Sequence, residues 1–375
     1  MRVLIPLFII GLIATSCLND TGNPIEKALA SDTINIKQVV DSIDQYEVQI
    51  KLTAISRIND SISFKDYEFQ VNDNHYFYPA STVKFPGAVL ALEKLNADSN
   101  YTMDTPFYLE GDSITTTFKK DITDIFAVSS NPTYNRIFDY LGKDHMNKRL
   151  RELGLSPARL SHRLSTSDAY NLTTKPLIFH ENDSVLKTTT PMINTPITPL
   201  TLERIKKGIG YYSNAILVEE PMDFSEKNYL PVSTIHEMMK RVIFPEAFAE
   251  HQRFKLSKKQ HNYLVTTMAI VPKEAGYDAK EYYDGYGKFF MYGDTTDTIP
   301  EHIKIHNKVG YAYGYLTDCA YIVDTKHNIE YILTATIHVN KDGIFNDDVY
   351  EYDTIGLPFL AELGREIHQI MIEQN

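Results

Sequence analysis

The sequence predicts an α+β fold, in which an α/β/α sandwich with an antiparallel sheet carries an all-helical subdomain. Two stretches support this fold class. Near the start of the chain, one helical pattern is followed by two strand patterns and then by a long apolar helix. Near the end, strand patterns lead into an amphipathic helix that would return to pack on the sheet.

The first elements follow from hydrophobic periodicity. Residues 34–46 carry apolar side chains at helical spacing, and residues 48–55 alternate between apolar and polar side chains, as a strand does. Residues 61–71 alternate again and would form the hairpin partner of that strand. An extended segment is then expected to end at Pro79 and Ala80, and a helix begins at about Ser81.

The middle of the chain, residues 166–300, gives weaker patterns. Helices are expected at 230–242 and 257–271, and Pro272 would stop the second of them. Three short segments have the character of loops or edge strands: 208–213, 222–224 and 285–291.

The C-terminal elements are clearer. Residues 319–323 and 328–340 have the pattern of strands, and residues 357–373 have that of the amphipathic helix. Cys319 lies in the first of these strands and is expected to be a buried small hydrophobe.

Ser81 and Lys84 form a Ser-x-x-Lys motif at the start of a helix. Residues three apart lie on one helix face, so the two side chains would be neighbours. A serine hydroxyl needs a base to become a nucleophile, and a desolvated lysine can serve as that base. By itself the motif is weak, because many helices begin with a capping serine and a solvated lysine.

Two further motifs strengthen the case. Ser129-x-Asn131 is followed by Asn135, and Lys308-x-Gly310 leads into the strand around Cys319. Each has an ordinary structural explanation when taken alone. The first could cap a helix, and the second could place a solvated charge at a strand end.

The order Ser-x-x-Lys, Ser-x-Asn, Lys-x-Gly resembles the serine β-lactamases and penicillin-binding proteins, and class A β-lactamases most closely. The likeness covers about residues 35–165 and 300–375. It implies a β-lactamase/transpeptidase-like fold and a serine hydrolase that forms an acyl-enzyme.

The resemblance also implies catalytic roles. Ser81 would attack a carbonyl, and Lys84 would take its proton directly or through water. Ser129 would pass a proton to the leaving nitrogen, and Lys308 would hold Ser129 and attract a substrate carboxylate.

Substrate binding is expected from four further positions. Asn131 would hydrogen-bond the substrate amide and Lys84, and the backbone N–H groups of Ser81 and Tyr311 would form the oxyanion hole. Asn135 and Gly310 complete the expected binding set through their places in the same motifs.

Two positions depart from the class A pattern. Val309 stands where those enzymes carry Thr or Ser, and it cannot donate a hydrogen bond to a substrate carboxylate. After Arg163, Ser165 stands where the glutamate that activates the deacylating water is expected. Asp168 could replace that base, or it could only cap a turn.

Three functions therefore stay open. The favoured one is hydrolysis of β-lactams or related amides, including D-alanyl amides of the cell wall. A DD-peptidase-like or penicillin-binding protein with slow deacylation is the second. The third is a catalytically idle fold member that binds a wall fragment. No cofactor is expected, and none of the twelve histidines shows metal-ligand spacing.

The N-terminus indicates export. Residues 1–16 resemble a secretory signal peptide, and Cys17 after small residues resembles a bacterial lipoprotein box. Cys17 would then carry the lipid, residues 17–33 would be a flexible tether, and residues 34–375 would form the catalytic domain, with an insertion within about 172–300. An ordinary signal peptide with an incidental cysteine is the alternative. The protein would lie in the periplasm or at the cell surface.

The net charge of the chain excludes some classes of binding partner. The formal net charge of −12 argues against binding to nucleic acid and against electrostatic docking on anionic lipid. Expected partners are a small-molecule or peptidoglycan-derived substrate, and a membrane reached only through the lipid.

Overall fold

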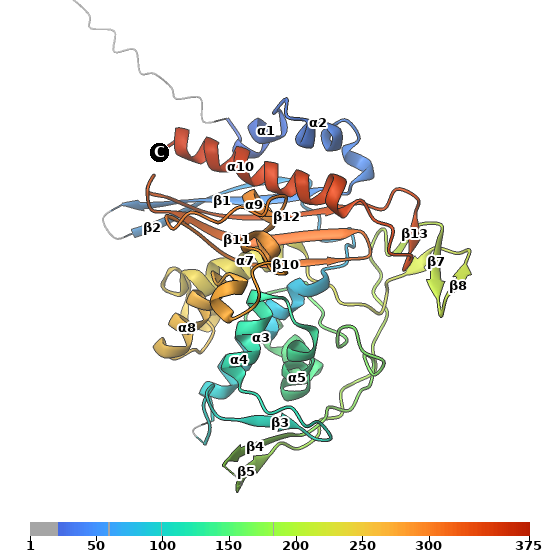
Figure 1. Cartoon of the computed structure of the whole chain (residues 1–375), viewed down its shortest axis with the longest axis vertical. Helices are drawn as coiled ribbons and strands as arrows, with labels where there is room; N and C mark the ends of the chain where they lie inside the picture. The colour runs from blue at the N-terminus through green and yellow to red at the C-terminus, as the bar shows by residue number, and fades with distance from the viewer. Residues whose placement is uncertain (1–21, 59–60, 99, 183) are drawn as a thin grey trace, which may run out of the picture.

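Helices cover both faces of one central sheet (Figure 1). The computed structural model describes residues 22–58, 61–98, 100–182 and 184–375. One face of the sheet carries α1, α2 and α10, and the other carries α3 and the helices around it. The predicted α/β/α sandwich with an attached helical subdomain is therefore confirmed.

The central sheet has five strands in the order β10-β11-β12-β1-β2, and all neighbours are antiparallel. Strands from the two ends of the chain meet where β1 pairs with β12, with Leu52 opposite Leu333. The strands are β1 (Gln49–Ile58), β2 (Ser61–Phe69), β10 (Ile303–Ala312), β11 (Tyr315–Asp324) and β12 (Ile329–His338).

The first helical layer consists of α1 (Pro24–Leu29), α2 (Ile34–Val40) and α10 (Leu357–Glu373). The predicted tether over residues 17–33 is wrong for α1. Ile25 and Ala28 are fully buried, and α1 packs against α10. This burial of apolar surface holds the segment on the domain. Residues 1–21, which include Cys17 and the segment expected to be a signal peptide, lie outside the described residues.

None of the helices in the described ranges is long and apolar enough to cross a membrane.

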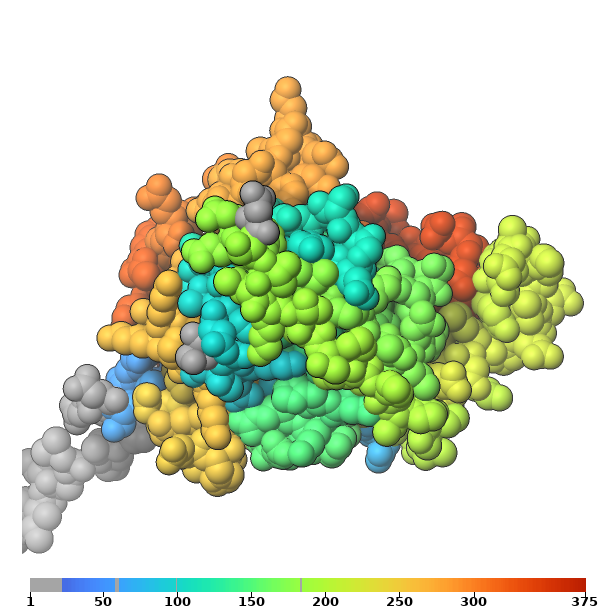
Figure 2. Space-filling view, turned by 90° about the horizontal axis from the view of Figure 1, so that it is seen from below, coloured from blue at the N-terminus to red at the C-terminus, as the bar shows by residue number. Residues whose placement is uncertain are grey.

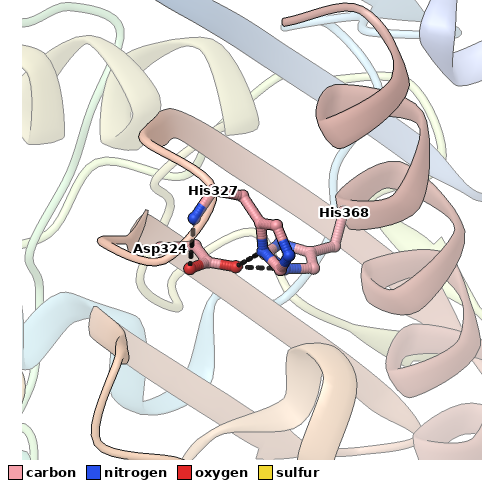
Figure 3. A group of neighbouring side chains, drawn as sticks. All are labelled: Asp324, His327 and His368. Carbon is pink, nitrogen blue, oxygen red and sulfur yellow. Dashed lines mark hydrogen bonds and ion pairs between the residues drawn. The ribbon is translucent and has the colours of Figure 1, made fainter.

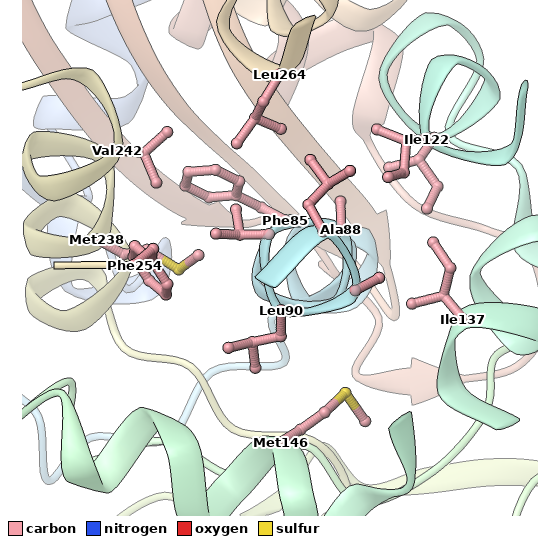
Figure 4. Packing of buried hydrophobic residues seen from close by; sticks show 14 of the residues in the cluster. Phe85, Ala88, Leu90, Ile122, Ile137, Met146, Met238, Val242, Phe254 and Leu264 are labelled. Carbon is pink, nitrogen blue, oxygen red and sulfur yellow. The ribbon is translucent and has the colours of Figure 1, made fainter. Parts of the chain in front are cut away.

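On the opposite face, α3 lies at the centre of a helical subdomain. Figure 4 shows Phe85, Ala88 and Leu90 pointing from α3 into an apolar core that neighbouring helices complete. Those helices are α3 (Lys84–Asn96), α4 (Phe118–Ala127), α5 (Asn131–Leu141), α6 (Lys143–Glu152), α7 (Val232–Ile243) and α8 (Lys258–Met268). The expected helices at 230–242 and 257–271 correspond to α7 and α8.

The middle of the chain adds small sheets at the rim. The hairpin of β7 and β8 projects from the body of the molecule (Figure 2). The strands of these small sheets, two of which are completed by β3 and β13 from other parts of the chain, are β3 (Phe107–Leu109), β4 (Leu177–Glu181), β5 (Ser184–Thr188), β6 (Lys206–Lys207), β7 (Gly210–Ser213), β8 (Ile216–Val218), β9 (Met222–Asp223) and β13 (Ile344–Phe345). The short helix α9 (Phe289–Tyr292) is buried against α10. The extent of an insertion within 172–300 stays a prediction.

Candidate active site

Ser81 lies in a tight turn, the 3₁₀ helix η2 (Ala80–Val83), that leads into α3. The expected α-helix start is thus displaced by one turn, and Lys84 is the first residue of α3. The preceding Ala80 has a positive φ of 46°. A left-handed alanine is rare and costs free energy, so surrounding contacts hold this turn in place. Residues three apart eclipse in a 3₁₀ turn, which puts Ser81 and Lys84 on one face.

Lys84 is completely buried, and its ammonium faces the second motif. Its Nζ donates to Asn131 Oδ1 at 2.7 Å, to Ser129 Oγ at 3.2 Å and to the carbonyl of Ser129. Burial lowers the pKa of Lys84 well below its usual value, and the charge of Lys308 lowers it further. This shift favours the neutral amine, which is the form that can accept a proton.

Lys308 reaches the same hydroxyl from β10. Its Nζ lies 2.8 Å from Ser129 Oγ and 2.8 Å from the carbonyl oxygen of Val309. Burial lowers the pKa of Lys308 to about 7, while the carboxylate of Asp318 acts in the opposite direction. Ser129 Oγ therefore lies between two buried lysines.

The helix-cap explanation for the second motif does not hold. The N-cap of α5 is Ser130, and its side chain makes no capping hydrogen bond. Ser129 has a positive φ of 56°, and its hydroxyl faces the two lysines. Asn131 is the first residue of α5, and its side chain binds Lys84 and Ser165.

Ser81, the candidate nucleophile, lies at the wall of a cavity. It is partly exposed and, within the described part of the chain, its hydroxyl has no hydrogen-bond partner. Ser81 lines the cavity together with Asn131 and Tyr311. Catalytic hydrogen bonds are often long before a substrate binds, so this geometry leaves Ser81 available for attack.

Gly310 brings β10 against the turn that carries Ser81. A Cβ added at Gly310 would lie 2.6 Å from the carbonyl oxygen of Pro79 and 2.9 Å from the backbone nitrogen of Ser81. Only glycine permits this approach. The next residue, Tyr311, therefore has its backbone beside the nucleophile, as an oxyanion hole requires.

The loop after α6 is fixed by Asn135. Its Nδ2 donates to the Leu164 carbonyl at 2.9 Å, and its Oδ1 accepts from the Leu164 amide at 2.8 Å. This clamp places Ser165 beside the site, where its hydroxyl accepts a hydrogen bond from Asn131 Nδ2 at 3.0 Å. A serine thus occupies the position expected for the deacylating glutamate.

Asp168 is not brought to Ser81. Its carboxylate lies 2.8 Å from Lys175 Nζ and accepts a hydrogen bond from Thr166 at 2.6 Å, and Asp168 does not line the cavity. The hydrogen bond from Lys175 has the largest effect and that from Thr166 the next largest, and together they lower the pKa of Asp168 to about 2. Within the described residues, the carboxylate that does line the cavity belongs to Asp348.

The cavity has a volume of about 530 Å³ and a wall rich in tyrosine. Lys227 reaches into this wall, with its Nζ 3.4 Å from the hydroxyls of both Tyr170 and Tyr313 and 5.1 Å above the ring of Tyr313. No salt bridge joins Lys227 to a described residue. Sequence reasoning missed it because no motif surrounds it. The tyrosines of the wall are Tyr78, Tyr170, Tyr311, Tyr313, Tyr350 and Tyr352.

Comparison with known proteins shows which family and which fold this chain resembles. A sequence model of the Beta-lactamase enzyme family matches residues 36–194, which include Ser81, Lys84 and Ser129. No curated protein matches the sequence.

Solved structures match over almost the whole chain. A β-lactamase from Sphaerobacter thermophilus is 11% identical with a TM-score of 0.51, and the match covers 93% of this chain and 96% of that one. A class A β-lactamase from Mycobacterium abscessus is 13% identical with a TM-score of 0.52, with coverages of 89% and 98%. A β-lactamase from Burkholderia ambifaria is 10% identical with a TM-score of 0.50, and the match covers 88% of this chain and 95% of that one.

These similarities support a serine-hydrolase type of function. At such identities the structural likeness shows the fold alone. The chain therefore has the fold of a β-lactamase-like serine hydrolase.

Proposed function

We propose that this protein is an exported serine hydrolase that forms an acyl-enzyme on Ser81 and acts on β-lactams or related amides, such as D-alanyl amides. The observation that carries the proposal is the Lys84–Ser129–Lys308 chain. Two lysines are buried there without a salt bridge to any described residue, and both bind one serine hydroxyl.

The buried lysines argue against an idle protein. Burying an ammonium without a carboxylate costs free energy, and a chain that used this site only as scaffold would be more stable with apolar residues there. Buried lysines with lowered pKa values beside a cavity that a serine lines are typical of catalytic sites.

The proposed mechanism follows from the contacts. Neutral Lys84 takes the proton of Ser81 as Ser81 attacks the substrate carbonyl. The backbone N–H groups of Ser81 and Tyr311 stabilise the oxyanion. Ser129 delivers its hydroxyl proton to the leaving nitrogen and takes a proton from protonated Lys84, which thereby returns to its neutral form. Lys308 orients the Ser129 hydroxyl.

Slow deacylation is the second candidate, as in a DD-peptidase-like or penicillin-binding protein. It is supported by Ser165 in the place of a glutamate and by Asp168, whose carboxylate is bound to Lys175. General-base assistance is worth about 10²–10⁴-fold. Its absence would let the acyl-enzyme accumulate.

The proposed location is the periplasm or the cell surface, with a lipid on Cys17. The support is the apolar segment and the small residues that precede Cys17. Lipidation would be tested by the mass of the mature N-terminus, and a chain that retains residues 1–16 would contradict it.

The enzymatic proposal is tested with a fluorescent penicillin, a chromogenic cephalosporin and intact-protein mass spectrometry. The wild type should gain the mass of one ligand. Ser81→Ala should lose the adduct, and Lys84→Ala should acquire it more slowly by orders of magnitude while the circular dichroism spectrum is unchanged.

The lifetime of the adduct separates the candidates. Rapid turnover without an adduct indicates efficient hydrolysis, and a long-lived adduct indicates slow deacylation. Labelling that survives Ser81→Ala, or a wild type that neither binds nor turns over any amide probe, would overturn the proposal.

A further inference from the structure

A second polar cluster lies on the face of the sheet that carries α10 (Figure 3). Asp324 ends β11, His327 lies in the turn that follows, and His368 comes from α10. The Asp324 side chain is fully buried, and its Oδ2 lies 2.6 Å from His327 Nδ1 and 3.2 Å from His368 Nε2.

Contacts around the cluster fix its orientation. The other carboxylate oxygen, Asp324 Oδ1, accepts hydrogen bonds from the backbone amides of Lys326 at 2.8 Å and His327 at 3.2 Å. The hydroxyl of Tyr331 lies 3.2 Å from His368 Nδ1. These hydrogen bonds leave Asp324 Oδ2 facing His327 Nδ1 and His368 Nε2.

We propose that Asp324, His327 and His368 bind a divalent transition-metal ion, with Zn²⁺ as the best match. One carboxylate oxygen and two imidazole nitrogens all lie within 4.8 Å of one another. Zn²⁺ favours such ligands in a tetrahedral arrangement. Three protein ligands leave a fourth position for water, and the His327 side chain, about a third exposed, gives access from solvent.

The protons of the cluster can be rearranged so that both histidine nitrogens that face Asp324 are free to bind a metal. Zinc needs a lone pair on His327 Nδ1 and on His368 Nε2. The proton of neutral His368 then moves to Nδ1 and is donated to the Tyr331 hydroxyl, which can accept it. This is the outer hydrogen bond that metal-binding histidines commonly make. The partly exposed ring of His327 can carry its proton on Nε2.

The position of the cluster points to a structural ion. Lys308 pairs with Cys319 on β11, and Asp324 lies farther along the same strand, about 17 Å away at the rise of an extended chain. His368 belongs to α10, whereas Asp324 and His327 belong to the end of β11 and the turn after it. The ion would therefore fasten α10 to the sheet and would take no part in the chemistry at Ser81.

Sequence spacing alone did not show this site. Asp324 and His327 are close in the chain, but His368 is 44 residues beyond Asp324. Only the return of α10 onto the sheet brings the third ligand into place.

The test uses the purified protein, without a histidine tag and stripped of metal by a chelator. Isothermal titration with Zn²⁺ should show one site, and zinc should raise the melting temperature. Co²⁺ should give a visible absorption band from the same site. His327→Ala and His368→Gln should each weaken zinc binding at least tenfold, and Tyr331→Phe should weaken it about 10–100-fold.

The matched control is His251→Ala, which removes an exposed histidine far from the cluster. It should bind zinc as the wild type does. The proposal is overturned if the wild type takes up no zinc at micromolar concentration, or if His327→Ala, a change in a partly exposed turn residue, binds zinc as tightly as His251→Ala. The cluster would then be a hydrogen-bonded network only.

Discussion

At the scale of single residues, the two buried lysines control each other. Lys84 and Lys308 both bind Ser129 Oγ, and the charge of Lys308 helps to lower the pKa of Lys84. Protons at such a pair are coupled, so a change at one lysine alters the titration of the other.

The first prediction concerns the pH dependence of acylation. The rate should rise with pH as Lys84 loses its proton, because only neutral Lys84 can act as a base. Lys308→Met removes a positive charge, so the pKa of Lys84 should rise and the ascending limb should move to higher pH. Labelling rates from about pH 5 to about pH 9 give the profile.

Lys304→Met is the control, because Lys304 lies on the same strand but is exposed. Its profile should match the wild type. If the rise of the labelling rate with pH has the same midpoint in Lys308→Met as in the wild type, then that rise does not come from the deprotonation of Lys84.

The second prediction concerns Lys227. Its charge faces the cavity without a salt bridge to a described residue, and Val309 offers a substrate carboxylate no hydroxyl. Lys227→Met should therefore slow acylation by penicillins that carry a second carboxylate. A hydrogen bond to a charged group is worth about 1.5–3 kcal/mol, or on the order of 10- to 100-fold. Labelling rates for a side-chain carboxypenicillin and its neutral analogue give the comparison.

Lys206→Met, a change of an exposed lysine on β6, should leave both rates unaltered. If Lys227→Met slows the neutral and the charged penicillin equally, Lys227 does not select for a carboxylate.

At the scale of elements, the contact between β10 and η2 aligns the site. Gly310 lies where a side chain would collide with backbone, not with flexible side-chain atoms. The strand or the turn would have to move to admit a methyl group.

The third prediction follows from that contact. Gly310→Ala should separate Tyr311 from Ser81 and reduce the acylation rate by about 10²-fold, since small misplacements have effects of that size. Gly287→Ala adds the same methyl group where the nearest atom is 3.9 Å away, and it should change little. The measurements are the labelling rates and the melting temperatures of both variants. Equal labelling rates would mean that acylation does not depend on the close approach of β10 to η2.

Elements with long periodic patterns could be predicted from the sequence, and short ones could not. The helix expected at 357–373 has those bounds in α10. The six-residue α1 offers too little periodicity, although Asn23 caps it through a hydrogen bond to the Ile25 amide. Its helical state depends on packing against α10, which local sequence does not reveal.

The same limit applies to the site. Ser81, Lys84, Ser129 and Lys308 lie in ordered motifs, so the sequence could name them. The direction of the Asp168 side chain depends on Lys175, and no motif indicates that pairing.

At the scale of the whole molecule, the first described helix, α1, belongs to the domain. Ile25 is fully buried in the core shared by α1, α10 and the sheet. Elements from the two ends of the described chain thus close the domain: α1 and α10 share one helical layer, and β1 pairs with β12.

The fourth prediction tests that closure. Ile25→Ala should lower the free energy of unfolding by about 2–5 kcal/mol, as expected for a truncated core isoleucine. Ile34→Ala, at a position 72% exposed, should cost no more than about 0.5 kcal/mol. Urea denaturation measures both; a negligible loss in Ile25→Ala would mean that α1 can detach while the rest stays folded.

The tyrosine wall of the cavity has an optical consequence. The chain has 25 tyrosines and no tryptophan, and the cavity concentrates six of the tyrosines around the nucleophile. Ultraviolet emission of the unmodified protein therefore comes from phenol rings alone. A single indole introduced by Tyr311→Trp, at a residue that is 54% exposed, would be the sole emitter of its kind and would report the arrival of a ligand without any attached dye.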